Sequence, residues 1–285
     1  MNFKLLAVSA LIAAGTSTAQ AGQFYIDNGV NFAPDTAPPT KVNATSTSLK
    51  DEMTVKYQSS TDIFFSNPVA GIQVGDSIIT SGGLAVGTLP FNSITSLNPG
   101  ETLGGTGFAD NGFGDDWILS FSFTNLAGTV NGFAGTFPTL NYTSGTIEML
   151  YSLDGTTFNN FMDLEVTSSA LTGGANLELR GLVDFTNVDA GFEDLFRLAD
   201  GTSFYDAWQQ VPPLEIVFIV DQNTNPALAT VTPFGDDGNG NPEGITITSN
   251  HDGSVTFQAV PEPSTVALLG LGLLGFGAKL RKKAA

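Results

Sequence analysis

The feature that most constrains this chain is a succession of short strand-like runs separated by turn residues. Residues 117–123 alternate apolar and polar side chains over their second half, as a strand with one buried face does. Further runs cover 146–153, 161–166, 177–184 and 214–220, and the last is almost wholly apolar, like a strand covered on both faces. Gly, Asn, Asp and Pro lie between the runs, where turns need them. The pattern predicts an all-β body of the β-sandwich or jelly-roll type.

Three segments add detail to this prediction. Residues 244–249 and 254–258 flank Asn250-His251-Asp252-Gly253, a tetrapeptide that predicts the turn of a hairpin. Residues 188–198 are expected to form a short helix, so the body should contain at most one or two short helices. Residues 33–48 are rich in Pro, Thr and Ser and predict a loop or an N-terminal arm.

The composition limits the chemistry that the chain can perform. It contains no cysteine, which excludes disulfides and thiol catalysis, while a hydrophobic content of 41% with 22 Phe allows a sizeable core. Between residues 22 and 260, five basic residues stand against 27 acidic ones, a formal net charge of −22. Such a surface repels nucleic-acid phosphates, so no nucleic-acid partner is expected. It favours solubility and the binding of cations and cationic polymers.

The N-terminus has the three parts of a secretory signal peptide in order. Lys4 supplies a short positive region, residues 5–14 form an apolar stretch, and Ala19-Gln20-Ala21 forms an A-x-A cleavage site before Gly22. Ten residues at 1.5 Å each are too short for a bilayer core about 30 Å thick, which argues against a permanent anchor. Residues 1–21 are therefore predicted to form a signal helix that is removed on export.

The C-terminus combines a Pro-bounded hinge, an apolar run and a basic cluster. Pro261-Glu262-Pro263 precedes the apolar residues 266–278, and residues 279–283 include four Lys or Arg side chains. Thirteen apolar residues are few for a permanent membrane span, and four Gly lower their helix propensity. The basic cluster would hold its end in the cytoplasm. We therefore expect a hydrophobic helix that inserts transiently into the inner membrane.

These residues resemble the PEP-CTERM sorting signal of proteins that exosortases process. The three parts of that signal are a Pro-Glu-Pro tripeptide, a short apolar helix and a terminal basic cluster, and they correspond to 261–263, 266–278 and 279–283. The resemblance implies processing near Pro261-Glu262-Pro263 by an exosortase-type enzyme. It also implies delivery to the surface or exopolymer matrix of a Gram-negative-type bacterium.

A second resemblance concerns the start of the mature chain. Residues 22–29, Gly-Gln-Phe-Tyr-Ile-Asp-Asn-Gly, are similar to the corresponding segment of flocculation-associated PEP-CTERM proteins. Members of that family contribute to bacterial aggregation within exopolysaccharide. The similarity extends through much of the body without a sharp motif, and it implies extracellular polysaccharide as a partner.

The chain lacks the sequence motifs of common catalytic sites. His251 is the single histidine, and the predicted hairpin places it in an exposed turn. No Gly-x-Ser-x-Gly nucleophile motif is present, and zinc sites built from His and Cys lack ligands. The spacing of Gly270, Gly272 and Gly275 matches a dinucleotide motif but falls inside the apolar run. No catalytic residue and no organic cofactor are therefore predicted.

Two acidic loops are candidates for calcium binding. The clearer one places Asp237, Asn239, Asn241 and Glu243 at every second position, so that several oxygen ligands could meet. The other covers residues 110–116. The clearer loop departs from the EF-hand pattern, with Pro242 where the sharp-turn Gly belongs, and for either loop the alternative is an ordinary acidic surface turn.

The sequence thus predicts three segments: a signal peptide at 1–21, an extracellular β-rich domain at 22–259 and a sorting signal at 260–285. The expected function is non-enzymatic, in a surface or matrix protein that contributes to aggregation. One alternative is a carbohydrate-binding module, in which exposed aromatic side chains would stack on sugars. The candidates for this stacking are Trp117, Tyr142, Tyr205 and Trp208. The other alternative is a secreted glycan hydrolase with two facing carboxylates about 5 to 10 Å apart.

Overall fold

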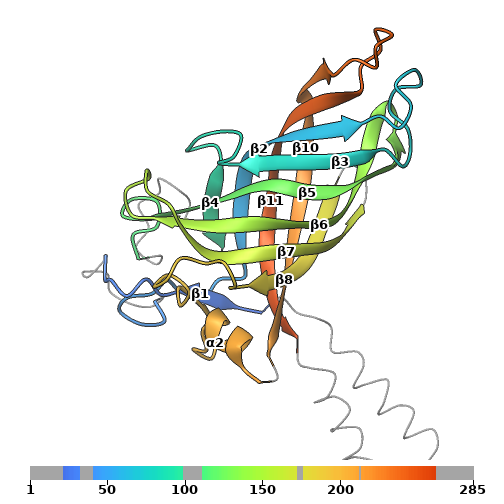
Figure 1. The fold of residues 1–285 in the computed structure, drawn as a ribbon. Helices are drawn as coiled ribbons and strands as arrows, with labels where there is room; N and C mark the ends of the chain where they lie inside the picture. The colour runs from blue at the N-terminus through green and yellow to red at the C-terminus, as the bar shows by residue number, and fades with distance from the viewer. Residues whose placement is uncertain (1–21, 33–40, 99–110, 172–175, 212, 261–285) are drawn as a thin grey trace, which may run out of the picture.

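A computed structural model describes residues 22–32, 41–98, 111–171, 176–211 and 213–260, and strands dominate it (Figure 1). The elements are β1 (Phe24–Ile26), β2 (Glu52–Phe64), β3 (Ser77–Gly83), β4 (Ser93–Asn98), β5 (Ile118–Ala134), β6 (Phe137–Ser152), β7 (Asn159–Leu171), β8 (Asn176–Asp184), β9 (Phe196–Leu198), α2 (Phe204–Gln209), β10 (Glu215–Phe234) and β11 (Gly244–Val260). The prediction of an all-β body is confirmed. The predicted signal helix and C-terminal helix lie outside the described residues.

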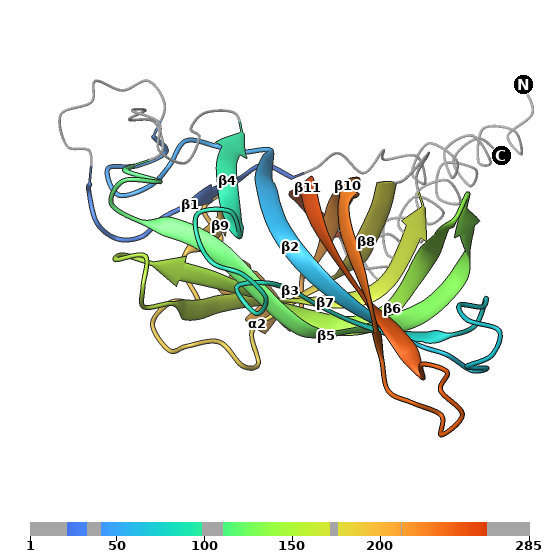
Figure 2. The same ribbon diagram turned by 90° about the horizontal axis from the view of Figure 1, so that it is seen from above.

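Eight of the strands form one antiparallel sheet that closes on itself. The order β2-β3-β5-β6-β7-β8-β10-β11 follows the chain, and β11 returns to pair with β2 from Met53–Val255 to Phe64–Gly244. β4 extends the sheet beside the first half of β2, and β1 pairs with β9 in a separate two-stranded sheet. The strands therefore curl around one interior (Figure 2). Opposite walls of this ring pack across a shared core, as the two sheets of a sandwich do.

Strand alternation decides which side chains enter the ring. Along β2, every second residue from Met53 to Ile63 is buried, and the residues between are partly or fully exposed. The end of the ring near β1, β9 and α2 is filled by aromatic rings. Phe196 lies at its centre, with ring centroids 5.4 Å from Phe24, 5.8 Å from Phe204 and 5.9 Å from Phe257. Aromatic packing thus fills this half of the interior.

Two local predictions were wrong. Residues 188–198 form turns and then β9 rather than a helix, because Gly191 is left-handed with φ 92° and Phe196 pairs with Ile26 of β1. Residues 250–253 are not a hairpin turn, since β11 runs through them without a break. A Cβ on Gly253 would lie 1.9 Å from the Asp221 carbonyl oxygen, so this glycine permits close strand approach rather than a turn.

Within the predicted loop at 33–48, the structure describes residues 41–48, which form bends and turns. Asp27 makes an isolated bridge to Ser46, and the Thr47 amide donates to the Ile26 carbonyl at 2.9 Å. This part of the segment is therefore held against β1. Residues 33–40 lie outside the described part of the chain.

Candidate functional site

The other half of the ring encloses a cavity of about 240 Å³. All eight strands of the ring contribute to its wall, which places the cavity inside the closed sheet. The lining residues are Tyr57, Ser59, Thr61, Thr80, Phe123, Leu126, Ala134, Phe137, Pro138, Thr139, Leu140, Tyr142, Leu171, Leu177, Leu179, Gln222, Ile247, Ser249 and His251. None of these side chains is an acid or carries a permanent charge.

One wall of the cavity is polar and follows the seam where β2 meets β11. The register places Tyr57 opposite His251 and Ser59 opposite Ser249. Because side chains alternate along each strand, all four point to the same side of the sheet, into the ring. Gln222 of the neighbouring β10 reaches the same place. The polar wall therefore results from the pairing that closes the sheet.

His251 lies at the centre of this polar wall. Its Nε2 atom is 2.7 Å from Ser59 Oγ and 2.9 Å from Ser249 Oγ, and its Nδ1 atom is 3.2 Å from Gln222 Nε2. The Tyr57 hydroxyl donates to Gln222 Oε1. The Tyr57 ring also stacks on the imidazole at a centroid distance of 4.8 Å. These contacts fix the position of the imidazole within the wall.

Burial keeps this network uncharged near neutral pH. His251 is 5% exposed, and desolvation lowers its pKa from 6.5 to about 4, against the opposing effects of hydrogen bonding to the Asn223 backbone and the charge of Asp252. Burial also raises the pKa of the Tyr57 hydroxyl well above its usual value. Both groups therefore act as neutral hydrogen-bonding groups.

A second hydrogen-bond network, made of hydroxyl groups, extends from β2 to β6. The Thr80 hydroxyl lies 2.9 Å from Thr61 Oγ1 and 2.7 Å from the Tyr142 hydroxyl, and all three residues are buried. Ser169 Oγ accepts a hydrogen bond from the Tyr142 amide at 2.7 Å. This network extends the polar lining of the cavity from the β2–β11 seam towards β6.

The remaining wall is apolar and reaches the surface. Leu177 and Leu179 of β8 are 6% and 2% exposed, and the strand register places Leu177 beside Gln222, at the edge of the polar wall. Towards the end of the cavity, Phe137 and Leu171 are 52% and 43% exposed. Large apolar side chains thus mark an opening, while the polar groups lie deeper.

The structure corrects the predicted surroundings of several residues. His251 is not in an exposed turn but buried in β11. Trp117 is 1% exposed and donates from Nε1 to the Asn111 carbonyl at 2.7 Å, and Tyr142 is 4% exposed. Neither ring is available to stack on a sugar. Tyr205 and Trp208 of α2 are partly exposed and stack on each other at 6.0 Å.

The predicted calcium loop is an acidic turn between β10 and β11. Asp237 Oδ1 accepts from the Asn239 and Asn241 amides at 2.8 and 3.2 Å, and its Oδ2 accepts from Asn241 Nδ2 at 3.0 Å. These bonds lower the pKa of Asp237. The described residues contain no cluster of three His, Cys, Asp or Glu side chains arranged to hold a metal. Calcium binding stays a prediction, and the melting temperature with and without the ion tests it.

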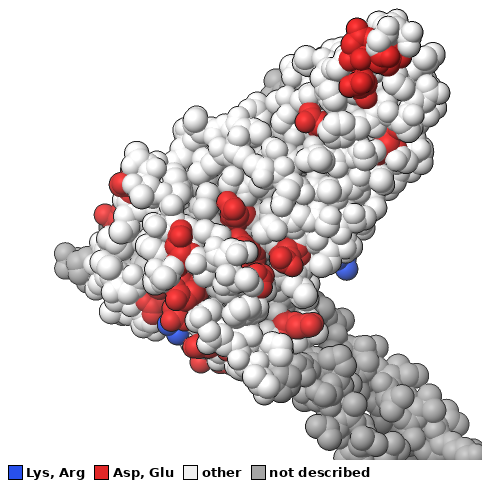
Figure 3. All heavy atoms as spheres, viewed as in Figure 1, with Lys and Arg blue, Asp and Glu red and all other residues white. Residues whose placement is uncertain are grey.

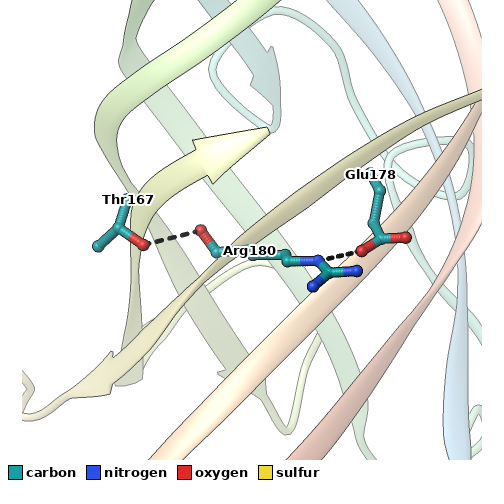
Figure 4. A network of polar contacts seen from close by, with 3 residues as sticks. All are labelled: Thr167, Glu178 and Arg180. Atoms are coloured by element: carbon teal, nitrogen blue, oxygen red, sulfur yellow. Dashed lines mark hydrogen bonds and ion pairs between the residues drawn. The ribbon is translucent and has the colours of Figure 1, made fainter. Parts of the chain in front are cut away.

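The outer surface is strongly acidic. Figure 3 shows acidic side chains at the tip of the β10–β11 loop and over the lower part of the body, with few basic ones. On the outer face of β8, Arg180 is paired with Glu178, and its carbonyl accepts a hydrogen bond from Thr167 at 3.3 Å (Figure 4). This cation is therefore partly neutralised, and the acidic character of the surface is retained.

The described part of the chain contains no helix with both the length and the apolar character to cross a bilayer. The predicted residues Ala19 and Ala21, the motif Pro261-Glu262-Pro263 and the run 266–278 all lie outside the described residues.

Comparison with known proteins concerns the C-terminus. The family model for the PEP-CTERM protein-sorting motif matches residues 259–282. The chain thus carries a PEP-CTERM sorting signal, which implies export, processing by an exosortase and direction to the cell surface. No curated protein and no solved structure matched the chain.

The cavity was not predicted from the sequence, although one signal for it was present. Tyr57, Ser59 and Thr61 alternate with more exposed residues between the apolar Val55 and Ile63. Neutral polar side chains at the inward positions of a strand indicate a polar interior. The sequence pattern does not indicate which strand pairs with β2 at this point, because Ser59 and His251 lie 192 positions apart.

Proposed function

We propose that this protein is a non-enzymatic component of the surface or exopolysaccharide matrix of a Gram-negative-type bacterium, where it promotes cell aggregation. The observation that carries the proposal is the sorting motif at 259–282 behind an exported β-domain. The formal charge of −22 supports an interaction with cations and cationic polymers between cells. In this role the protein acts by being present in the matrix, so its effect depends on delivery and amount.

The arrangement around His251 supports a role without catalysis. Ser59 and His251 resemble the nucleophile and base of a catalytic triad, because their side chains are within hydrogen-bonding distance. The third position is held by Gln222, whose neutral side chain cannot stabilise imidazolium as a carboxylate would. A pKa of about 4 also makes His251 a weak base at neutral pH. Ser59 lies in the paired middle of β2, where backbone amides serve the strand ladder rather than an oxyanion.

The proposal is tested by comparing a strain lacking the gene with the parent and with a complemented strain. We expect the deletion to reduce aggregation strongly, and complementation to restore it in proportion to the amount of surface protein. Microscopy with fractionation measures both quantities. Release of reducing sugar from the cells' own polymer by the purified protein would contradict the proposal and favour a glycan hydrolase instead.

Carbohydrate binding is the second candidate, supported by the stacked pair on α2. Tyr205 and Trp208 lie at an interplanar angle of 19°, and both are partly exposed. We expect Trp208→Ala to weaken retention on the immobilised native polymer, because stacking on a sugar depends on the ring face. Phe133→Ala, at a 46% exposed position on β5, is the control that removes another exposed ring. Equal retention of all three proteins would exclude this surface.

A further inference from the structure

We infer that the cavity inside the closed sheet is a binding site for a small, neutral, mostly apolar molecule that carries one hydrogen-bonding group. Surface delivery and aggregation do not require such a site, so the inference goes beyond the function proposed above. It depends on the size of the cavity, on the division of its wall into a polar and an apolar part, and on its opening.

The size of the cavity suits a small organic molecule. A packed protein interior leaves few voids larger than a water molecule. The cavity measures about 240 Å³, whereas an apolar cavity of about 150 Å³ is large enough to bind benzene. A second hollow in the interior, lined by residues that include Val55, Ile94 and Met149, measures about 20 Å³ and provides the comparison within the same molecule. The open half therefore departs from ordinary packing, as ligand pockets do.

The division of the wall fixes the orientation of the ligand. Leu126 of β5 and Leu177 and Leu179 of β8 present apolar surface, and the group around His251 presents hydroxyl, amide and imidazole atoms along the β2–β11 seam. A few convergent polar groups in a largely apolar pocket are typical of sites that orient a ligand. The apolar body of the ligand would lie along the leucines, with its polar group directed at the β2–β11 seam.

The seam has hydrogen-bonding capacity for this polar group. A serine hydroxyl has one donor and two acceptor positions. Among the described residues, Ser59 and Ser249 each contact the other hydroxyl and His251 Nε2, which leaves one position on each. An alcohol, an amide or an ester carbonyl can take these positions. The two hydroxyls thus provide adjacent contacts for a single ligand group.

The same wall disfavours ions. Among the described residues, no side chain that lines the cavity carries a permanent charge, and the histidine in it is neutral. Burial of a carboxylate without a cationic partner is more unfavourable than neutral hydrogen bonds can offset. The acidic exterior adds long-range repulsion of anions. The site therefore distinguishes a neutral amphiphile from the anion of the same length.

The opening allows access to the cavity without unfolding of the sheet. Phe137 and Leu171 line the cavity and are about half exposed, so they lie at its mouth. Apolar side chains at this position would contact the apolar end of a bound molecule. The mouth is thus matched to the end of the ligand that is remote from His251.

Calorimetric titration of the protein recovered from the cell surface tests this inference, with 1-octanol and octanoate as probes. We expect 1-octanol to bind saturably at one site at neutral pH, and octanoate to bind at least about tenfold more weakly because its charge is buried without a partner. Absence of saturable 1-octanol binding would overturn the inference, and so would equal affinity for the two probes. This comparison needs no substitution.

A matched pair of variants locates the site. Leu177→Trp fills the cavity from β8, and Leu182→Trp places the same side chain on the outer face of the same strand, where Leu182 is 36% exposed. We expect Leu177→Trp to weaken 1-octanol binding at least about tenfold by occluding the cavity, and Leu182→Trp to retain it. Unchanged binding by a folded Leu177→Trp protein would place the probe elsewhere and overturn the inference. Melting curves establish whether each variant is folded. If Leu177→Trp does not fold, the comparison of 1-octanol with octanoate on the unsubstituted protein decides the inference.

Discussion

Replacement of Pro261, Glu262 and Pro263 by alanine is expected to abolish surface delivery and, with it, the contribution of the protein to aggregation. The matched sorting motif at 259–282 contains this tripeptide, whereas the ring of strands ends at Val260. The variant should therefore fold as the parent does while failing to be processed. A large effect on location without an effect on stability would separate sorting from folding.

Intact-mass measurement and fractionation provide the readout. The parent should be recovered at the surface with Gly22 as its first residue and without residues 279–283, whereas the variant should retain the basic cluster in the membrane fraction. Phe133→Ala, at an exposed position on β5, is the control for a change in the body, and it should be delivered normally. Recovery of unprocessed 1–285 at the surface, or normal aggregation by the tripeptide variant, would contradict the sorting model.

The sequence predicted the parts of this protein that depend on local patterns. Strand alternation at 117–123 and the three ordered elements of the tail are properties of contiguous residues, and both were confirmed, the first by β5 and the second by the family match. The helix predicted at 188–198 failed because the pairing of Phe196 with Ile26, distant in sequence, outweighed local preference.

The cavity could not be predicted because it depends on closure of the sheet. Asn250, Asp252 and Gly253 have the composition of a turn, so His251 between them was predicted to be exposed. In the structure, Gly253 lies in β11 and pairs with Gln222 of β10 on one side and with Val55 of β2 on the other. Only this pairing makes His251 an inward-facing residue, and sequence patterns carry no information on which distant strand will be the partner.

Burial of His251 leads to the second large effect, a loss of stability on mild acidification. The pKa is about 4 in the folded protein and 6.5 as an ordinary value, so between these limits the unfolded chain binds more protons. The contribution of the neutral imidazole is fully present above pH 6.5 and is lost as the pH falls towards 4. The difference in pKa corresponds to roughly 3 kcal/mol across this window.

His251→Gln is the variant that isolates this contribution, because glutamine keeps a hydrogen-bonding side chain but does not titrate. Denaturant unfolding at several pH values across the window should show a steeper loss of stability for the parent than for the variant. Asp27 and Asp76 also have lowered pKa values, and their contribution is lost at lower pH in both proteins, so it cancels in the comparison. Tyr57 and Tyr142, the titratable groups that share the cavity wall, do not ionise in this range. Parallel pH profiles for the two proteins would mean that the imidazole is solvated in the folded state. That result would contradict the conclusion that His251 is a buried, neutral group in the polar wall of the cavity.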